Sequence, residues 1–213
     1  MTLSEIETAA HASGMMIMGA FHPENETAGT IILVGGDAGM WPAFTSSPEH
    51  SDGADDPLDR WSKRVIGKIA TRHKAKCVFP SDGPPYAPFT RWSLESGRFW
   101  QSPAGMLVHD TAGLMVSIRG AICLAEKLDL PPAVSANPCD GCSDRPCISS
   151  CPVDALKGIE YDVASCKDHL LSEEGAECMT RGCIARRACP VSRAFNRAPD
   201  QTAFHMRAFL CIV

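Results

Sequence analysis

Eight cysteines are crowded between Cys139 and Cys189, and no other feature of this sequence limits its fold so strongly. The chain has 11 cysteines in 213 residues, so only Cys77, Cys123 and Cys211 lie elsewhere. The N-terminus is acidic and has no apolar core, so we expect no signal peptide and a cytoplasmic protein. In a reducing compartment, clustered cysteines favour metal ligation over disulfide bonds.

The spacing of these cysteines narrows the kind of metal site. They form the run Cys-x2-Cys-x4-Cys-x3-Cys-Pro and four further single cysteines, the last of which also precedes proline. In order, the eight are Cys139, Cys142, Cys147, Cys151, Cys166, Cys178, Cys183 and Cys189. The bacterial ferredoxin run, Cys-x2-Cys-x2-Cys-x3-Cys-Pro, differs only in its middle gap, and its fourth cysteine binds the other cluster of the pair. The run therefore indicates two complete 4Fe–4S sites.

Two other uses of eight cysteines remain open on the residues alone. Two structural zinc sites would need the same number, but such sites usually contain paired Cys-x2-Cys units, and this segment has one. A single cluster with four free thiols is the third possibility. The ferredoxin-type ending favours two iron–sulfur clusters over both.

The rest of the chain predicts an α+β fold, with an N-terminal mixed sheet with helices and a C-terminal two-cluster ferredoxin-like module. Hydrophobic periodicity, proline positions and β-branched runs mark the elements. We expect helices over residues 4–13, 57–73 and 89–96, and strands over residues 15–21, 30–34, 77–79, 106–109 and 114–122. The prolines from Pro131 to Pro138 mark a boundary. They divide the chain into a cofactor- or substrate-binding domain (1–130) and a cysteine domain (131–213).

The segment from Cys139 to Pro190 resembles the two-cluster ferredoxin module of epoxyqueuosine reductases and related corrinoid-dependent reductases. The resemblance implies that the last cysteine returns to the first cluster. It assigns one cluster to Cys139, Cys142, Cys147 and Cys189, and the other to Cys151, Cys166, Cys178 and Cys183. The chain lacks the Trp-Gly-Lys motif of the corrinoid pocket in epoxyqueuosine reductases, so we expect a different substrate.

The N-terminal region carries a second resemblance. Its segments Asp56-Pro-Leu-Asp-Arg-Trp-Ser62, Pro84-Pro-Tyr-Ala-Pro-Phe89 and Arg119-Gly-Ala-Ile122 are similar to a group of bacterial proteins labelled ferredoxins. The N-terminal domains of that group look like the flavin-reductase-type fold of cobalamin-processing proteins. The resemblance implies a bound corrinoid or flavin in addition to the clusters.

Several side chains of this region could contact a flat cofactor. The candidates are Tyr86, Phe89, Trp92, His109 and Arg119. Ordinary packing of the aromatic rings and the histidine explains the same residues, and so does a surface position for the arginine. A glycine turn, Gly35–Gly39, follows a buried strand and could cradle a phosphate, although a tight turn is the simpler interpretation.

Charge excludes one class of function and suggests a partner. The net charge of −5 and the pI of about 5.8 argue against a general nucleic-acid binder. The longest apolar run, Met15 to Phe21, is too short to span a membrane. Arginines are interleaved with the last cysteines, where they could face an anion, dock an acidic redox partner or form ordinary salt bridges.

These observations predict an iron–sulfur redox protein. Electrons from a redox partner would pass through two 4Fe–4S clusters to a corrinoid, a flavin or a substrate in the N-terminal domain. The alternatives are a non-catalytic corrinoid or flavin carrier and a simple electron-transfer ferredoxin, so the sequence leaves open whether the chain is an oxidoreductase. A simple ferredoxin needs only the cysteine region, and the N-terminal domain argues against it.

Overall fold

The computed structural model describes residues 2–24, 27–132, 136–158 and 160–211, and it has a mixed α+β fold. The chain divides into two compact units. The first contains Met1–Arg98 and Ser117–Ser135, and the second contains Phe99–Val116 and Ala136–Val213. The sequence alone places residues 99–116 in the N-terminal domain, whereas in the structure this segment belongs to the unit that holds the crowded cysteines.

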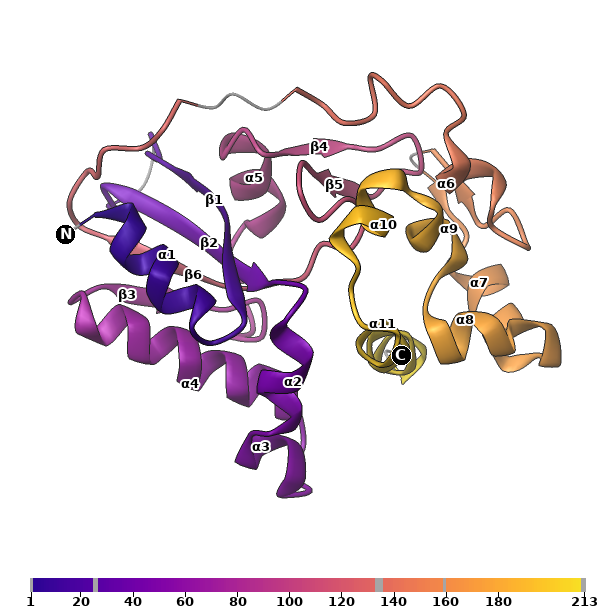
Figure 1. Cartoon of the computed structure of the whole chain (residues 1–213), viewed down its shortest axis with the longest axis horizontal. Coiled ribbons are helices and arrows are strands. Elements are labelled where there is room, and N and C mark those ends of the chain that lie inside the picture. Colours follow the sequence, from indigo (N-terminus) through magenta and orange to yellow (C-terminus); the bar gives the residue numbers. More distant parts are fainter. Residues whose placement is uncertain (1, 25–26, 133–135, 159, 212–213) are drawn as a thin grey trace. The chain divides into compact units, whose positions relative to one another are not determined.

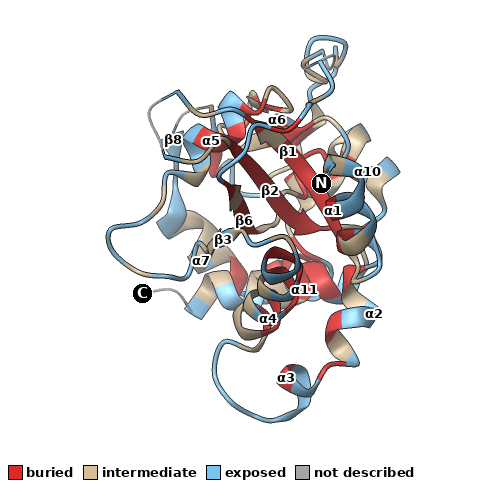
Figure 2. Cartoon of the chain, turned by 90° about the vertical axis from the view of Figure 1, so that its left-hand side faces the viewer, coloured by how far each residue is buried: buried red, intermediate tan, exposed pale blue. Residues whose placement is uncertain are grey.

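The first unit is built on a four-stranded sheet in the order β1-β2-β6-β3 (Figure 1). Its strands are β1 (Met15–Phe21), β2 (Thr30–Gly36), β3 (Lys76–Val78) and β6 (Ile118–Leu124). All three pairings are antiparallel, so the predicted mixed sheet is wrong. A parallel pair needs a crossover connection of a dozen or more residues, and the short link between β1 and β2 forms a hairpin instead. Figure 2 shows that β1 and β2 are buried along almost their whole length, whereas β3, at the edge of the sheet, is not buried.

Two amphipathic helices pack against this sheet and against each other, α1 (Leu3–His11) and α4 (Pro57–Arg72). The N-terminus of α1 is closed by a capping box, in which Thr2 and Glu5 satisfy each other's backbone N–H groups. The helix therefore begins one residue earlier than the predicted start at Ser4. In α4, proline occupies the first turn as predicted, and apolar residues at helical spacing, including Leu58, face the core.

The other helices of the first unit are short. They are α2 (Met40–Thr45), α3 (Pro48–Ser51) and α5 (Phe89–Glu95). The glycine turn before α2 is a tight turn, in which the N–H of Gly39 donates to the Asp37 carboxylate at 2.6 Å. We therefore assign no phosphate site to it.

The second unit consists of small hairpins and short helices. Its strands are β4 (Phe99–Gln101) paired with β5 (Leu107–His109), and β7 (Leu156–Lys157) paired with β8 (Glu160–Tyr161). Its helices are α6 (Pro146–Ser149), α7 (Val163–Leu171), the 3-10 turn η1 (Glu173–Gly175), α8 (Ala176–Arg181), α9 (Ile184–Ala188), α10 (Pro190–Phe195) and α11 (Pro199–Cys211). An apolar core that includes Val108, Leu114, Leu156 and Ala185 joins residues 99–116 to the cysteine region.

One predicted strand is shorter than expected. The sequence predicts a strand over residues 114–122, but β6 begins at Ile118. The reason is tertiary, because residues 114 and 115 form hydrogen bonds with side chains of the second unit. Among the described residues, no helix has the length and apolar character needed to cross a bilayer.

Candidate metal centre

Four of the crowded cysteines surround one cavity in the second unit. The cavity has a volume of about 230 Å³, and Cys139, Cys142, Cys147 and Cys189 contribute to its wall. Most of the remaining wall is apolar, from the prolines, Val108, Leu114 and Val191. Among the described residues that line it, the one charged side chain is Arg145. The cavity is thus a largely dry space bordered by four thiols.

Local backbone structure brings these four sulfurs to the cavity. The N–H of Cys142 donates to the carbonyl of Cys139 at 3.2 Å, which closes a tight turn, and Asn137 Oδ1 accepts from the N–H of Cys139 at 3.0 Å. Cys147 is buried in α6. Cys189 lies between α9 and α10, where Pro190 occupies the first helical position and turns the chain away.

The other four cysteines, Cys151, Cys166, Cys178 and Cys183, form a second group, which is visible in their electrostatics. Burial raises the pKa of the Cys166 thiol, and the neighbouring Cys183 and Cys151 raise it further. Burial likewise raises the pKa of Cys178, with Cys183 and Cys166 acting in the same direction. Cys166 lies in α7, Cys178 lies in α8, and Cys183 precedes α9.

The first group is coupled in the same way. Burial raises the pKa of Cys139, and Cys147, Cys189 and Cys142 add to the effect. Burial also raises the pKa of Cys147, with contributions from Cys189 and Cys142. Thiols that oppose one another's ionisation lie in the same neighbourhood, and a bound cation would reverse this effect.

Two hydrogen bonds reach sulfurs of the second group from one hairpin. The N–H of Ala155 donates to Cys151 Sγ at 3.3 Å, and the hydroxyl of Tyr161 donates to Cys166 Sγ at 3.3 Å. Donors of this kind surround metal-bound thiolates and tune the metal. Sequence reasoning missed Tyr161. Its only signal was a polar aromatic residue five positions before a candidate ligand.

The two groups of cysteines are near neighbours. Cys183 and Cys189 flank the five-residue helix α9, and a helical rise of 1.5 Å per residue puts their backbones about 9 Å apart. Cys147 and Cys151 are four positions apart around α6, and α6 contacts α9. Two sites held by these residues would therefore lie within one small body.

The donor set fits iron–sulfur clusters. Soft thiolates in groups of four are the usual ligands of a 4Fe–4S cluster, and the first group borders a dry cavity. None of the 11 cysteines forms a disulfide. Across residues 2–24, 27–132, 136–158 and 160–211, no three His, Cys, Asp or Glu side chains converge as ligands of a single ion. A cluster takes each thiolate on a different iron, so its ligands need not converge on one point.

The aromatic candidates lie in the first unit and do not form an enclosed site. Tyr86 is 71% exposed, whereas Trp92 is buried and contacts Phe89 with ring centroids 5.3 Å apart. Phe89 also lines an open groove with Pro88 and Leu94. Trp92 is thus a core residue. The groove presents the single aromatic ring of Phe89, so it does not hold a flat ligand between two rings.

His109 lies in the second unit and is fully buried. Its Nδ1 accepts hydrogen bonds from the backbone N–H groups of Thr111 and Ala112, at 3.2 and 3.1 Å. The same nitrogen lies 3.3 Å from Asp110 Oδ1. The ring also packs on Phe99, with centroids 4.7 Å apart. These contacts give His109 a structural role in the turn that follows β5.

Arg119 belongs to the first unit and lies in β6. Its Nη2 donates to Asp59 Oδ1 of α4 at 2.8 Å. Burial lowers the pKa of Arg119, and the Asp59 carboxylate acts against this shift. The structure therefore brings Tyr86, Phe89, Trp92 and Arg119 into one unit and places His109 in the other.

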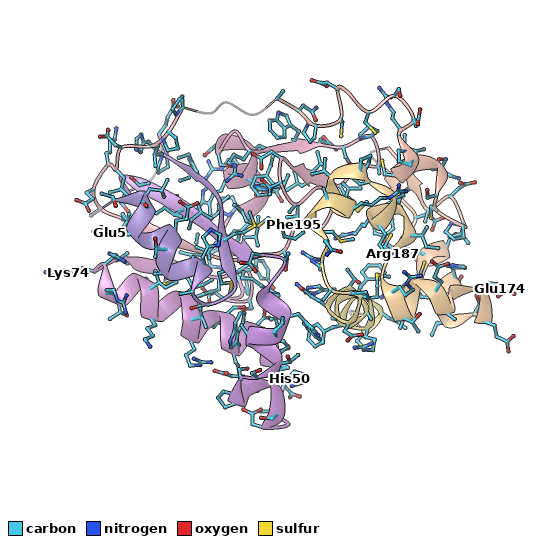
Figure 3. The ribbon with its side chains drawn as sticks, viewed as in Figure 1. Glu5, His50, Lys74, Glu174, Arg187 and Phe195 are labelled. Carbon is cyan, nitrogen blue, oxygen red and sulfur yellow. The ribbon has the colours of Figure 1, made fainter. Side chains whose placement is uncertain are left out.

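Four of the interleaved arginines, Arg186, Arg187, Arg193 and Arg197, donate hydrogen bonds inside the second unit. Arg186 donates to the carbonyl of Leu114 at 3.4 Å, and the buried Arg197 donates to the carbonyl of Met115. Arg187, labelled in Figure 3, donates to Glu177 at 2.6 Å. Arg181 and Arg193 are the exposed members of the set.

A solved structure shares this fold. The chain is similar to epoxyqueuosine reductase from Streptococcus thermophilus, with a TM-score of 0.56 over 95% of this chain and 70% of that one. The sequence identity is 15%, so the similarity concerns the fold. No protein-family model and no curated protein sequence matches the chain.

Proposed function

We propose that this chain is an iron–sulfur redox protein with two 4Fe–4S clusters. Cys139, Cys142, Cys147 and Cys189 would hold one cluster. The other would be held by Cys151, Cys166, Cys178 and Cys183. The clusters would supply one-electron transfer, and the acceptor would be a corrinoid, a flavin or a substrate bound by the same chain.

The grouping of the cysteines carries this proposal. The cavity and the mutual pKa effects divide the eight thiols into two sets of four. These are the same two sets that the resemblance to the ferredoxin module implies. Each set takes a cysteine from the other half of the segment, Cys189 for the first and Cys151 for the second. Such crossing of ligands is the arrangement of two-cluster ferredoxins.

The residues around the first set would serve electron transfer in two ways. Apolar side chains such as Val108 and Leu114 line the cavity and would limit the access of water to a bound cluster, and so its hydrolysis. The short helix α9 places the backbones of Cys183 and Cys189, one from each set, about 9 Å apart. With both clusters bound, the second unit would form a compact electron relay.

Support for a reductase comes from two resemblances. A solved protein with this fold is named epoxyqueuosine reductase, and the cysteine region resembles corrinoid-dependent reductases. The missing Trp-Gly-Lys motif favours a substrate other than epoxyqueuosine. A carrier without catalysis would bind the corrinoid or flavin tightly and not turn over.

Alanine substitutions test the ligand sets. In protein purified without oxygen, Cys142→Ala and Cys166→Ala should each lose about half of the iron, from different clusters, because each cluster needs its own four thiolates. Cys77→Ala is the matched control, because Cys77 is a partly buried thiol of the first unit whose pKa burial raises to about 11. Full iron content in both test variants would refute the assignment.

A titration tests the acceptor. Hydroxocobalamin, FMN and FAD are added separately to the cluster-loaded protein, and the visible spectrum and binding are followed. Binding of one of them, followed by its reduction by clusters that were reduced beforehand and freed of excess dithionite, supports the reductase. Tight binding without electron transfer supports the carrier, and no binding of any leaves an electron-transfer ferredoxin.

A further inference from the structure

Tyr161 is the one side chain with a hydroxyl on a sulfur of either cysteine set in the part of the chain that the structure describes. Its oxygen lies 3.3 Å from Cys166 Sγ. Tyr161 belongs to β8, and its partner across the hairpin, Leu156, is buried in the core of the second unit. The hairpin also carries Ala155, whose N–H donates to Cys151 Sγ. Two of the four sulfurs in the second set therefore receive donors from one element.

Neighbouring residues hold the phenol in place. The Tyr161 ring stacks on Phe209 of α11, with centroids 6.0 Å apart and planes 20° apart. Lys167 lies over the ring of Phe209, with Nζ 5.8 Å from its centroid. The backbone continues directly into α7, where the N–H of Asp162 donates to the carbonyl of Ala155 at 2.9 Å. Ring stacking and the hairpin hydrogen bond thus fix the position of the Tyr161 hydroxyl.

The hydroxyl remains a donor at neutral pH. An ordinary tyrosine has a pKa of about 10, so its hydroxyl keeps its proton at pH 7. Two sulfurs of the second set receive hydrogen bonds, whereas the cavity at the first set is lined mostly by apolar side chains and by Arg145.

An added electron makes the thiolate sulfurs of an iron–sulfur cluster more negative. A donor to one of those sulfurs stabilises the reduced form and raises the reduction potential. If the two clusters of the proposed function are present, we propose that Tyr161 is a positioning residue that raises the reduction potential of the cluster on Cys151, Cys166, Cys178 and Cys183 above that of the other. Electrons would then rest on this cluster at equilibrium.

Tyr161→Phe removes the hydroxyl and keeps the ring. In a potentiometric titration of the cluster-loaded protein followed by electron paramagnetic resonance, one midpoint should fall and the other should stay. At a fixed potential, the ratio of reduced to oxidised second cluster should drop roughly tenfold, which equals about 59 mV for a one-electron couple. The iron–thiolate stretching bands of one cluster should also shift in resonance Raman spectra.

Phe209→Leu is the matched control. It removes the stacking partner but leaves the hydroxyl, so its effect on the midpoint should be no larger than that of Tyr161→Phe. Unchanged midpoints in Tyr161→Phe, or a larger fall in Phe209→Leu than in Tyr161→Phe, would overturn the inference. Iron and sulfide are measured first in every sample. Wild-type protein without clusters would refute the proposed function, whereas two intact clusters with unmoved midpoints would refute the role of Tyr161 alone.

A second variant covers the case in which Tyr161→Phe assembles poorly. The chain has two tyrosines, so 3-fluorotyrosine incorporated in a Tyr86→Phe background replaces Tyr161 alone. Tyr86 is exposed and lies in the first unit, so its removal is tolerable. Fluorine makes the phenol a stronger donor, and one midpoint should rise. A midpoint that stays or falls would contradict the inference.

Discussion

The backbone N–H of Leu114 donates a hydrogen bond to Ser192 Oγ at 2.8 Å, and both groups are buried. Leu114 precedes β6 in the sequence and Ser192 follows it, but both residues belong to the second unit. The contact holds the segment that carries β5 against the helix that follows Cys189. A wall of the cysteine cavity therefore depends on residues far from the cysteines in sequence.

Ser192→Ala should loosen this segment. The substitution leaves the buried N–H of Leu114 without an acceptor, at a cost of about 1–3 kcal/mol. Amide exchange of the peptide around Leu114, followed by mass spectrometry, should accelerate about tenfold or more. Ser4→Ala is the control, since Ser4 is exposed and lies in the first unit. Equal exchange in wild type and Ser192→Ala would show that the contact contributes nothing.

Gly113→Ala should be more damaging than a glycine substitution with the same backbone strain. Both Gly113 and Gly53 have positive φ, 58° and 73°. A Cβ on Gly113 would lie 2.5 Å from the backbone nitrogen of Ser192, whereas nothing lies within 4 Å of one on Gly53. We expect Gly53→Ala to cost about 1 kcal/mol from the backbone, and Gly113→Ala about 2–5 kcal/mol. Thermal midpoints of the two variants test this, and equal losses would count against the close approach.

The ion pair of Glu49 and Arg64 should make the first unit less stable in acid. The Arg64 hydrogen bonds lower the pKa of Glu49 from 4.5 to about 2. A carboxylate with a lowered pKa in the folded state stabilises the fold fully above about pH 4.5, and this contribution is lost as the pH falls toward 2. Three of the four tryptophans lie in the first unit, so urea unfolding followed by tryptophan fluorescence reports on it.

Glu49→Gln supplies the comparison for that titration. Its urea midpoint should be lower than that of wild type at pH 7 and at pH 5, and the difference should shrink at pH 3. Acid would also release sulfide from the iron–sulfur clusters, but this loss should be the same in wild type and in Glu49→Gln. A difference that stays constant between pH 7 and pH 3 would contradict the lowered pKa of Glu49.

The pair of Arg119 and Asp59 should respond unequally to its two deletions. Arg119 is 14% exposed in its side chain and Asp59 33%. Asp59→Ala leaves a nearly buried guanidinium without its partner, whereas Arg119→Met leaves a carboxylate that water can reach. We expect Asp59→Ala to destabilise the first unit more, by about 1–3 kcal/mol relative to Arg119→Met. Urea unfolding checks the order, and a larger effect of Arg119→Met would favour a binding role for this arginine.

Much of the fold could be predicted from local patterns. The strand over residues 15–21 coincides with β1, and the helix predicted from Pro57 differs from α4 by one residue. Strong hydrophobic patterns and a proline at the first helical position specify these elements by themselves. The three-residue strand β4 was not predicted, because so short an element forms only through its partner β5. The early start predicted for β6 failed for the same kind of reason, since contacts to Ser192 and Arg197 take residues 114 and 115 out of the strand.

The candidate site divides in a similar way. Cysteine spacing suggested eight ligands because the chemistry of thiolates is visible in sequence. The contact of Tyr161 with Cys166 is not visible in the sequence. The two-residue strand β8 and the Phe209 ring on α11 decide where the hydroxyl lies. His109 was chosen as a cofactor contact, but its ring is committed to the turn at Thr111 and Ala112, which only the backbone path reveals.

The central claim is that the eight crowded cysteines hold two 4Fe–4S clusters. The most direct measurement is the iron, acid-labile sulfide and zinc content of protein purified without oxygen, together with its visible spectrum. We predict about eight irons and eight sulfides per chain and a broad absorbance near about 400 nm that dithionite bleaches. Stoichiometric zinc without sulfide and without that absorbance would contradict the account.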